Sequence, residues 1–362
     1  MKIHGNPHRT IETDAAENVR ILDQTLLPHD VVWRTMTTWQ DASKAISIMQ
    51  VRGAPLIGVT AAFGVALAMR DDASDTSLDT VCKSLFATRP TAVNLRWGLD
   101  RMKAALGSLP SRERAAAAWS EAVQIADEDV RTNESIGRNG HELFQRIFEQ
   151  KAASSGPLNV MTHCNAGWLA AVDWGMSLSP VYQAHDAGMP VHVWVSETRP
   201  RNQGAALTAF ELNQHGVPHT LISDNAAGHL MQRGLVDLCI TGADRVTASG
   251  DVANKIGTYL KALAAKANNV PFYVAVPVST IDWTISDGVR DIPIEQRSSR
   301  EVTHIPGRNS VGAQEEVLIC PENTPARNDA FDVTPAALVS ALITEHAVVD
   351  CSAEGLLVLK PA

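Results

Sequence analysis

Apolar and polar residues alternate in a regular order over the second half of the chain. Short apolar runs, the length of buried strands, occupy residues 158–162, 191–196, 219–223, 236–241 and 271–276. Stretches with helical apolar spacing lie between or after them, at residues 166–173, 203–214, 225–233 and 252–267. Strands that alternate with helices are typical of a doubly wound parallel sheet. We therefore predict an α/β fold with a Rossmann-like parallel-sheet domain over residues 151–362.

The first 150 residues have a different pattern, which predicts a mostly helical domain. Helical spacing covers residues 39–68, 91–106 and 111–150, while residues 1–30 read as a small sheet or arm. Residues 151–157 are small and polar and end in Gly-Pro, so we place the domain boundary there. Near the C-terminus, residues 297–329 predict an ordered excursion or lid, residues 334–345 a helix and residues 355–359 a strand.

Two of the predicted strands end in reactive side chains. The run at 236–241 leads into Asp244, and the run at 158–162 leads into His163 and Cys164. Ligands of open α/β sheets bind beyond the carboxyl ends of parallel strands. If both strands belong to one sheet, Cys164 and Asp244 meet in the same crevice, although 80 positions separate them.

Each of these residues also has a plainer interpretation. Asp244, like Asp224 after the run at 219–223, could simply cap a helix N-terminus. Cys164 could be a small buried apolar residue, although a helix start beside it would favour the thiolate. We expect His163 to be structural, since no metal-ligand spacing accompanies it.

An arginine beside a predicted helix start is a candidate anion ligand. Arg52 and Gly53 lie just before Pro55, a residue favoured in the first turn of a helix. The guanidinium offers paired donors to a phosphate, and the helix start adds backbone N–H groups. Arg96 and Gln203 are weaker candidates of the same kind. No dinucleotide or P-loop fingerprint is present, so we expect no nucleotide cofactor.

Composition narrows the class of protein. A net charge of −9 argues against general binding to nucleic acid or to anionic membranes. The five cysteines are scattered and lack a CxxC pair, which favours neither disulfides nor a metal site and fits a reducing cytoplasm. The start of the chain lacks a signal-peptide core, and the longest apolar run, residues 56–69, is too short to span a bilayer. We expect a cytoplasmic protein.

Taken together, the motifs resemble the methylthioribose-1-phosphate isomerase family, which is related to the regulatory subunits of the translation initiation factor 2B exchange factor. The matching segments run through nearly the whole chain. They lie at residues 52–55, 94–96, 162–167, 197–204, 224–226, 242–245, 254–258, 292–295 and 331–335. One departure is visible, since the family usually has Asn-Pro where this chain has Asn328-Asp329. That departure concerns local loop geometry.

The resemblance implies conversion of 5-methylthioribose 1-phosphate to 5-methylthioribulose 1-phosphate in methionine salvage. Carried over by position, it makes Cys164 and Asp244 the catalytic pair. It also implies a homodimer formed through the C-terminal domain, with no cofactor. Seven positions would hold the substrate: Arg52, Gly53, Ala54, Arg96, Gln203, Asn254 and Lys255.

Two other functions stay open. An isomerase of 5-deoxyribose 1-phosphate or ribose 1,5-bisphosphate would share the chemistry and differ at the sugar's C5 group. A regulatory subunit would keep the sugar-phosphate pocket without turnover and would not need both Cys164 and Asp244.

The chemistry requires an unusual pair of groups, because a phosphate on the anomeric oxygen blocks ring opening to a free aldehyde. Our hypothesis is that protonated Asp244 donates to the ring oxygen while the Cys164 thiolate handles the C2 proton. This route needs a raised carboxyl pKa and a lowered thiol pKa. A hydride shift from C2 to C1 is the competing mechanism.

Overall fold

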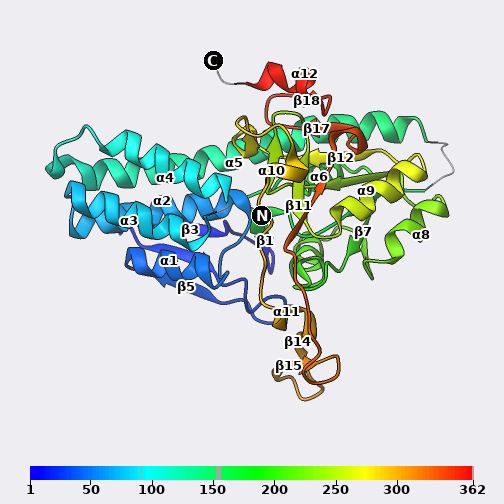
Figure 1. Cartoon of the computed structure of the whole chain (residues 1–362), viewed down its shortest axis with the longest axis horizontal. Helices are drawn as coiled ribbons and strands as arrows, with labels where there is room; N and C mark the ends of the chain where they lie inside the picture. The colour runs from blue at the N-terminus through cyan, green and yellow to red at the C-terminus, as the bar shows by residue number, and fades with distance from the viewer. Residues whose placement is uncertain (91, 152–155, 361–362) are drawn as a thin grey trace.

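The computed structural model describes residues 1–90, 92–151 and 156–360. Figure 1 shows a layer of helices from the first part of the chain beside a sheet-containing part built from the rest, with a hairpin projecting between them. This arrangement agrees with the predicted α/β class, helical first and sheet-containing later.

The large sheet has seven strands in the order β18-β17-β12-β9-β6-β7-β8. Six are parallel, and the short edge strand β18 is antiparallel. The five strands predicted between residues 158 and 276 all belong to it. The strands are β6 (Leu158–Thr162), β7 (Val191–Ser196), β8 (His219–Ile222), β9 (Leu238–Thr241), β12 (Phe272–Ala275), β17 (Ala341–Ile343) and β18 (Val348–Val349).

The chain enters this sheet in the middle. It adds β7 and β8 on one side of β6 and then returns to add β9, β12 and β17 on the other. The direction of winding therefore reverses between β6 and β9, which are direct neighbours with Thr162 opposite Ile240. In doubly wound sheets, a ligand crevice opens at this reversal, beyond the carboxyl ends of the two strands.

Helices cover both faces of the sheet. Val160 packs with α6 (Ser179–Asp186), α7 (Ala209–His215) and the later half of α5 (Ser111–Glu149). The next residue, Met161, points to the other face, where α8 (Ala226–Gln232) and α9 (Thr258–Ala267) pack. Since successive strand residues point to opposite faces, a strand covered on both sides is apolar throughout. This explains why the strands were visible as short apolar runs.

The helical part packs around α2 (Ala54–Asp71). Its neighbours are α1 (Trp39–Ser47), α3 (Asp75–Thr88), α4 (Val93–Leu106) and α5. The predicted helix at 39–68 is in fact two helices, because Met49 and Gly53 adopt left-handed backbone conformations between them. Helix α3 was not predicted. The helix predicted at 91–106 corresponds to α4, and its first position, residue 91, lies outside the described residues.

The N-terminal residues form small sheets, as predicted. A hairpin joins β1 (Lys2–Ile3) to β2 (Asn6–Pro7), and a three-stranded sheet contains β3 (Ile11–Thr13), β4 (Val19–Leu22) and β5 (Trp33–Met36). Ile3 and Leu22 belong to the core of the large sheet, whereas Ile11 belongs to the helical core. The arm therefore connects the two cores.

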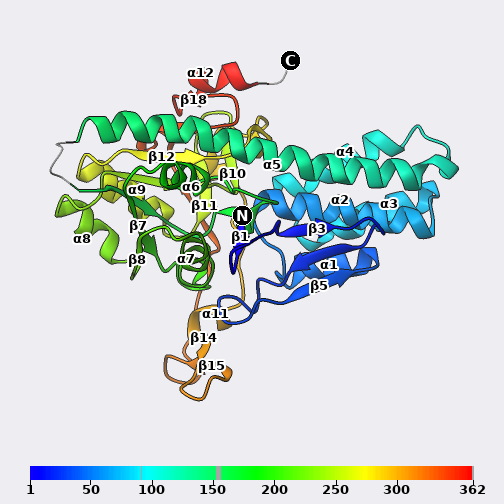
Figure 2. The same cartoon turned by 180° about the vertical axis from the view of Figure 1, so that it is seen from behind.

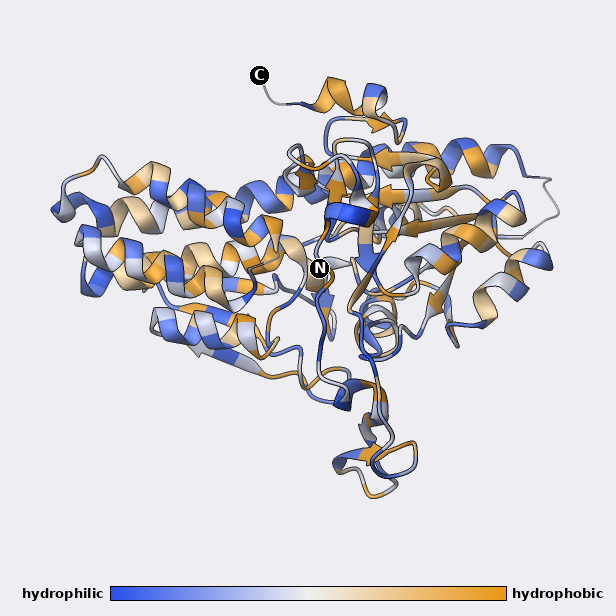
Figure 3. Cartoon of the chain, in the orientation of Figure 1, coloured by the Kyte–Doolittle hydropathy of each residue, from blue (hydrophilic) through white to orange (hydrophobic). Residues whose placement is uncertain are grey.

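Among the described residues, one helix is long and apolar enough to cross a membrane by composition alone, and it is α2. Its residues are 89% buried inside the protein. Figure 3 shows apolar residues gathered on α2 and on the strands of the large sheet, with hydrophilic residues on the outer helices. The apolar character of α2 is thus accounted for by the core.

The longest element, α5, is a single helix of 39 residues that runs along both parts of the molecule (Figure 2). Ile125 and Ala126 lie in the helical core, and Ile136 and Phe144 in the core of the sheet. Most of the predicted domain junction, residues 152–155 of 151–157, lies outside the described residues. The division into domains at that point stays a prediction.

A second, four-stranded sheet was not predicted. It is built from β13 (Ile281–Asp282), β10 (Arg245–Thr247), β11 (Val252–Lys255) and β16 (Phe331–Thr334), in that order. The predicted helix at 252–267 is wrong in its first part: residues 252–255 form β11, and α9 begins only at Thr258. The reason is pairing with β16, more than 70 residues further along the chain.

Three other predicted elements are also corrected. Residues 166–173 contain only the short 3-10 helix Trp168–Ala170, because the buried Glu211 carboxylate takes the N–H groups of Trp168 and Leu169. The predicted helix at 334–345 contains the end of β16, the turn Ala336–Leu338 and β17. The predicted strand at 355–359 is helical: α12 (Ala353–Leu356) followed by the 3-10 turn Leu357–Leu359.

The remaining elements are short helices and strands, most of them in the last third of the chain. The predicted excursion at 297–329 contains α11 (Arg300–Thr303) and the projecting hairpin of β14 (His304–Arg308) and β15 (Gln314–Leu318) (Figure 1). Short helical turns also occur at Gly204–Thr208, Val278–Thr280 and Gly288–Asp291 (α10).

Candidate functional site

Cys164 follows β6 at the reversal point of the large sheet. Its backbone adopts a left-handed conformation, with φ of 65°. Its N–H donates to the hydroxyl of Thr198 (2.8 Å), and its carbonyl accepts from the hydroxyl of Thr208 (2.7 Å). Left-handed backbone is costly for residues other than glycine, so these two hydrogen bonds hold the thiol in a specific direction.

Asp244 follows β9, the neighbour of β6, and leads into β10. Its N–H donates to the carbonyl of Ala253 on β11 (2.9 Å), which places it beside Asn254 and Lys255. Part of the surface of Asp244 is accessible to solvent, but its carboxyl group is surrounded by protein atoms. Burial raises the pKa of that carboxyl, although the charges of Lys255, Arg89 and Arg52 act against the shift.

Two cations link the thiol and the carboxyl group. Arg52 and Lys255 each interact electrostatically with both Cys164 and Asp244. Lys255 is 8% exposed and its ammonium lies 4.7 Å from the ring centre of Phe331, while burial lowers its pKa. The structure thus brings Arg52, Cys164, Asp244 and Lys255 from four separate segments around one space, at the sheet edge where the strand pattern placed the thiol and the carboxyl group.

Arg52 is held firmly in this position. One of its guanidinium nitrogens donates to the side-chain oxygen of Asn165, and another donates to the Asn165 carbonyl (2.7 Å). Gly53 then begins α2 at a φ of 90°, and a β-carbon there would come within 2.4 Å of the Ala170 carbonyl oxygen. The helix start and the guanidinium therefore form a rigid group of donors suited to an anion.

Behind Asn165 lies a buried carboxylate that the sequence analysis did not single out. Glu211 is fully buried and accepts four hydrogen bonds, which come from Asn165 Nδ2 (2.8 Å), Tyr182 Oη (2.6 Å) and the N–H groups of Trp168 and Leu169 (both 2.9 Å). A β-carbon at Gly167 would lie 1.8 Å from this carboxylate. A sequence signal existed, since Glu211 is four positions after the buried Leu207, on the apolar side of a helical stretch.

The expectation of a lowered thiol pKa at Cys164 is wrong. Burial raises the pKa of this thiol, and the effects of Arg52, Lys255 and the Asn165 N–H only partly oppose that. The expected neighbouring helix start is absent, because residues 168–170 form a single 3-10 turn whose N–H groups face Glu211. Burial therefore favours the thiol over the thiolate at Cys164 in the free protein.

Three further predicted ligands, Asn254, Gln203 and Arg96, come from three separate segments and differ in their surroundings. Asn254 is buried on β11 and donates to the Thr258 hydroxyl (3.0 Å). Gln203 is 5% exposed, and its Oε1 finds no hydrogen-bond partner among the described residues. Arg96 is exposed on α4, with its guanidinium 4.0 Å from the ring centre of Phe86. Their roles, like those of the other predicted site residues, stay predictions.

A cavity opens beside Asp244, lined by Gly53, Ala54 and an arginine that the sequence analysis missed. That arginine, Arg89, lies at the end of α3 and pairs with Glu295 at 3.5 Å. Much of the remaining lining is apolar: Ile57, Ala92, Ala253, Ile292, Pro293 and Phe331. Asp244 therefore belongs both to the charged group around Cys164 and to the lining of a largely apolar cavity.

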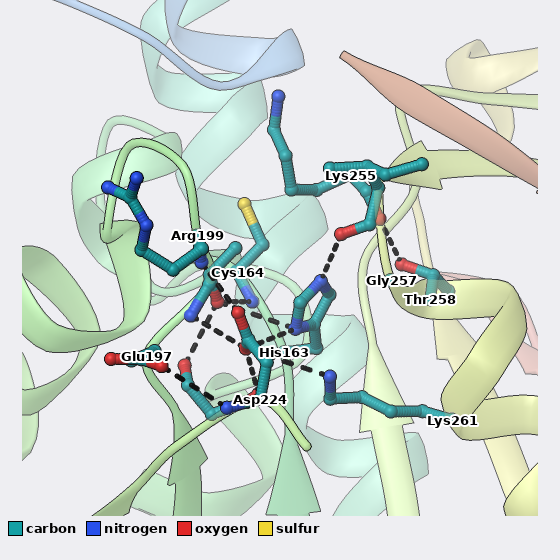
Figure 4. Close-up of polar contacts among 12 residues, drawn as sticks. His163, Cys164, Glu197, Arg199, Asp224, Lys255, Gly257, Thr258 and Lys261 are labelled. Carbon is teal, nitrogen blue, oxygen red and sulfur yellow. Dashed lines mark hydrogen bonds and ion pairs between the residues drawn. The ribbon is translucent and has the colours of Figure 1, made fainter. Parts of the chain in front are cut away.

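A buried polar network lies on the far side of Cys164 (Figure 4). Asp224 does not cap α8, as one interpretation had it, since its carboxylate accepts the N–H groups of Thr198 (2.8 Å) and Arg199 (2.6 Å). Lys261 lies 3.8 Å from the same carboxylate. The buried His163 has its Nε2 2.8 Å from the Ile256 carbonyl, and burial lowers its pKa to about 3. A neutral, structural His163 agrees with the prediction.

Metal binding has no evident place in this arrangement. Across residues 1–90, 92–151 and 156–360, no three His, Cys, Asp or Glu side chains come together in a way that could hold a metal ion. The donors around Cys164 are mostly cationic, which suits an anionic ligand. The expectation that no cofactor is used stays a prediction.

The fold and the site define an α/β protein in which two cationic side chains lie near a buried thiol and a carboxyl group of raised pKa, at the edge of a doubly wound sheet. The sequence model of the Initiation factor 2 subunit family matches residues 50–351. The chain belongs to this family.

Relatives of known name cover the chain from end to end. Proteins named methylthioribose-1-phosphate isomerase are 60% identical in Methylorubrum extorquens and 58% identical in Rhodospirillum rubrum. In both, the alignment covers 100% of this chain, with 98% and 94% of the relative. The resemblance inferred from the motifs is therefore confirmed over the full length.

Solved structures agree on the fold. The 5-methylthioribose 1-phosphate isomerase of Pyrococcus horikoshii superposes with a TM-score of 0.84 at 38% identity, covering 98% of this chain and 96% of that one. A structure from A. fulgidus described as translation initiation factor eIF-2B, subunit delta, gives a TM-score of 0.77 at the same identity, with 95% and 96% covered. Structural likeness alone thus does not separate the two groups.

Proposed function

We propose that this protein is an aldose–ketose isomerase that converts 5-methylthioribose 1-phosphate to 5-methylthioribulose 1-phosphate in methionine salvage. The observation that carries this proposal is the meeting of Cys164 and Asp244 with Arg52 and Lys255. The names of relatives at about 60% identity support the same reaction. A regulatory subunit would not require both the thiol and the carboxyl group.

Substrate binding follows from the arrangement of charges. The phosphate binds at the start of α2, where Arg52 and the backbone of Gly53 and Ala54 provide donors, and Lys255 faces it from β11. Gln203, Asn254 and Arg96 complete the proposed set of ligands. The unpaired Gln203 Oε1 is a buried acceptor that a sugar hydroxyl could satisfy.

The apolar space beside Asp244 favours a methylthio group at C5. Ile57, Ile292 and Phe331 would bury it without loss of hydrogen bonds. The cations at this cavity, Arg89 and Arg245, pair with Glu295 and Asp282, whose negative charges disfavour a second phosphate, although the buried Arg89 Nε has no hydrogen-bond partner among the described residues. Ribose 1,5-bisphosphate and 5-deoxyribose 1-phosphate both stay alternatives.

The two reactive groups have separate tasks. Asp244, the pKa of whose carboxyl group is raised by burial, donates a proton to the ring oxygen and opens the ring without a free aldehyde. Cys164 is the partner that transfers the C2 proton, and its raised thiol pKa means that the thiolate is a minor form at neutral pH. A direct hydride shift from C2 to C1 is the alternative mechanism.

Turnover of 5-methylthioribose 1-phosphate by the purified protein tests the proposal, with Cys164→Ser and Asp244→Asn beside it. We expect each variant to lose about 10²- to 10⁴-fold in kcat, the usual contribution of a general acid or base. Parallel assays with 5-deoxyribose 1-phosphate and ribose 1,5-bisphosphate determine the preference at C5. Sugar-phosphate binding without turnover by the wild type would identify a regulatory protein instead.

Substrate carrying deuterium at C2 distinguishes the two mechanisms. Loss of the label to solvent identifies proton transfer, whereas a hydride shift retains the label at C1. Full retention would count against exchange of the C2 proton with solvent and would leave the isomerisation itself intact.

We also place the protein in the cytoplasm as a homodimer formed through the C-terminal part. The free cysteines and the family resemblance support this proposal.

A further inference from the structure

Two residues near the candidate site have backbone conformations that their side chains disfavour. Cys164 has a φ of 65° and Thr198 a φ of 69°. For a β-branched residue such as threonine, this region is a genuine outlier, so surrounding contacts must hold it. Both residues are buried, and they contact each other, since Thr198 Oγ1 accepts the Cys164 N–H at 2.8 Å.

The contacts that hold Thr198 lead to Asp224. The two oxygens of its carboxylate accept the N–H groups of Thr198 and Arg199 respectively, and one of them also accepts the Ser196 hydroxyl. Burial opposes ionisation of Asp224, but the hydrogen bond from Ser196 and the charge of Lys261 outweigh it and hold its pKa below the usual value. A charged carboxylate thus binds two successive backbone N–H groups of the turn after β7.

The side chains divide into two groups on either side of the Cys164 backbone. In Figure 4 the Cys164 thiol and the Lys255 side chain point away from His163 and Asp224. The groups that face the thiol are Arg52, Lys255, Asp244 and the N–H of Asn165. On the other side, the Thr198 hydroxyl binds the Cys164 N–H and donates to the Ser196 carbonyl (2.9 Å).

We propose that Asp224, acting through Thr198, is a positioning residue for Cys164. Its carboxylate fixes the left-handed turn at Thr198, and the Thr198 hydroxyl fixes the left-handed backbone of Cys164, so that the thiol faces Arg52, Lys255 and Asp244. This inference rests on the proposed role of Cys164 in isomerisation. Neither Asp224 nor Thr198 contacts the substrate in this account.

The test compares Thr198→Val, which keeps the shape but removes the hydroxyl, with Thr198→Ser, which keeps the hydroxyl. Asp224→Asn replaces one acceptor oxygen with an amide donor that opposes a backbone N–H. Thr60→Val is the matched control, because it also removes a buried hydroxyl, one that donates to the Leu56 carbonyl inside α2.

The first readout is the pH dependence of iodoacetamide alkylation at Cys164, followed on its own peptide by mass spectrometry without substrate. We expect Thr198→Val and Asp224→Asn to raise the alkylation midpoint by roughly one pH unit, because the thiol loses its cationic neighbours. Thr198→Ser and Thr60→Val should leave it where it is in the wild type.

The second readout is steady-state kinetics. We expect kcat to fall roughly 10- to 100-fold in Thr198→Val and Asp224→Asn, as for a misplaced reacting group, with KM nearly unchanged. Thr198→Ser should restore both parameters. If Asp224→Asn fails to fold, the valine and serine pair still decides the question.

The outcomes separate this inference from the proposed function. An unchanged alkylation midpoint in Thr198→Val, with only the melting temperature lowered, would overturn the positioning role even if the wild type turns over. A wild type without isomerase activity would refute the proposed function, while the alkylation midpoints would still report on how Cys164 is held.

Discussion

The thiol of Cys164 is subject to opposing influences. Burial favours the neutral form, whereas Arg52, Lys255 and the Asn165 N–H favour the thiolate. The net direction is a pKa above the ordinary 9.0. The Cys164 thiolate is therefore the minor form at neutral pH, and its fraction increases as the pH rises.

The rate of isomerisation should therefore depend on two groups, because the mechanism needs the Cys164 thiolate and the acid form of Asp244 at the same time. We expect kcat/KM to rise about tenfold per pH unit below the lower of the two pKa values, to be level between them and to fall above the higher one. Initial rates over the whole range of pH in which the protein is stable would measure this profile. Cys164→Ser should lose the limb that belongs to the thiol, and a wild-type profile with no limb from Cys164 would contradict its role as base.

Glu211 acts on the site indirectly. It accepts a hydrogen bond from Asn165, and Asn165 in turn binds the guanidinium of Arg52. Replacement by glutamine puts an amide where four donors now converge. We expect Glu211→Gln to lower the free energy of unfolding by about 1–3 kcal/mol for each donor left unpaired, and to raise KM as Arg52 loses its anchor. Urea denaturation and kinetics measure the two effects.

Glu142→Gln is the matched control for this variant, because Glu142 is exposed on α5. It should change neither the free energy of unfolding nor KM. A Glu211→Gln enzyme with normal stability and normal KM would show that Asn165 holds Arg52 without help.

Among the secondary-structure elements, the contact between α5 and α6 depends on two glycines. A β-carbon at Gly137 would lie 2.2 Å from the side chains of Ser179 and Gln183, and one at Gly140 would lie 2.3 Å from Pro180. Gly140→Ala should destabilise the protein by about 1–3 kcal/mol through overpacking, despite the better helix propensity of alanine. Thermal or urea unfolding provides the measurement.

The same substitution in α8 serves as its control. A β-carbon at Gly228 would meet Ala264 at 3.5 Å, an ordinary contact. Gly228→Ala should be neutral or slightly stabilising. If both substitutions change the free energy of unfolding equally, helix propensity determines the effect, and the space around the new β-carbon does not.

How well an element could be predicted from the sequence depended on where its hydrogen-bond partners lie. Strands β6, β9 and β12 are buried on both faces, so their apolar runs were visible locally. The strand β11 was predicted as helix, because its character comes from β16, far along the chain. The placing of Cys164 and Asp244 at one sheet edge followed from strand tips alone. The contacts of Glu211 with Asn165 and of Thr198 with Cys164 join segments far apart in the sequence, so local spacing could indicate at most that Glu211 is buried.

For the whole molecule, the proposed homodimer is open to direct test. Leu357 and Val358 in the C-terminal part are 63% and 76% exposed in the single chain. Sedimentation velocity should give the mass of two 38.9 kDa chains. If the contact lies in the C-terminal part, Leu357→Asp should shift the protein toward one chain.

Val311→Asp, on the hairpin tip and 85% exposed, is the control and should not change the mass. A wild type that sediments as a single chain would contradict the proposed assembly.

The division of α5 between two cores also bears on how the protein is made. All but one of the buried residues of the helical core lie between Ile11 and Ala126, the exception being Val172, so nearly all of this core is synthesised in the first third of the chain. The other core contains Ile3 and Leu22 together with Ala341 and Ile343. The strand β1 contacts α7, so Ile3 is synthesised long before the residues that cover it. A nascent chain must keep this apolar position from aggregating until more than half of the protein has left the ribosome.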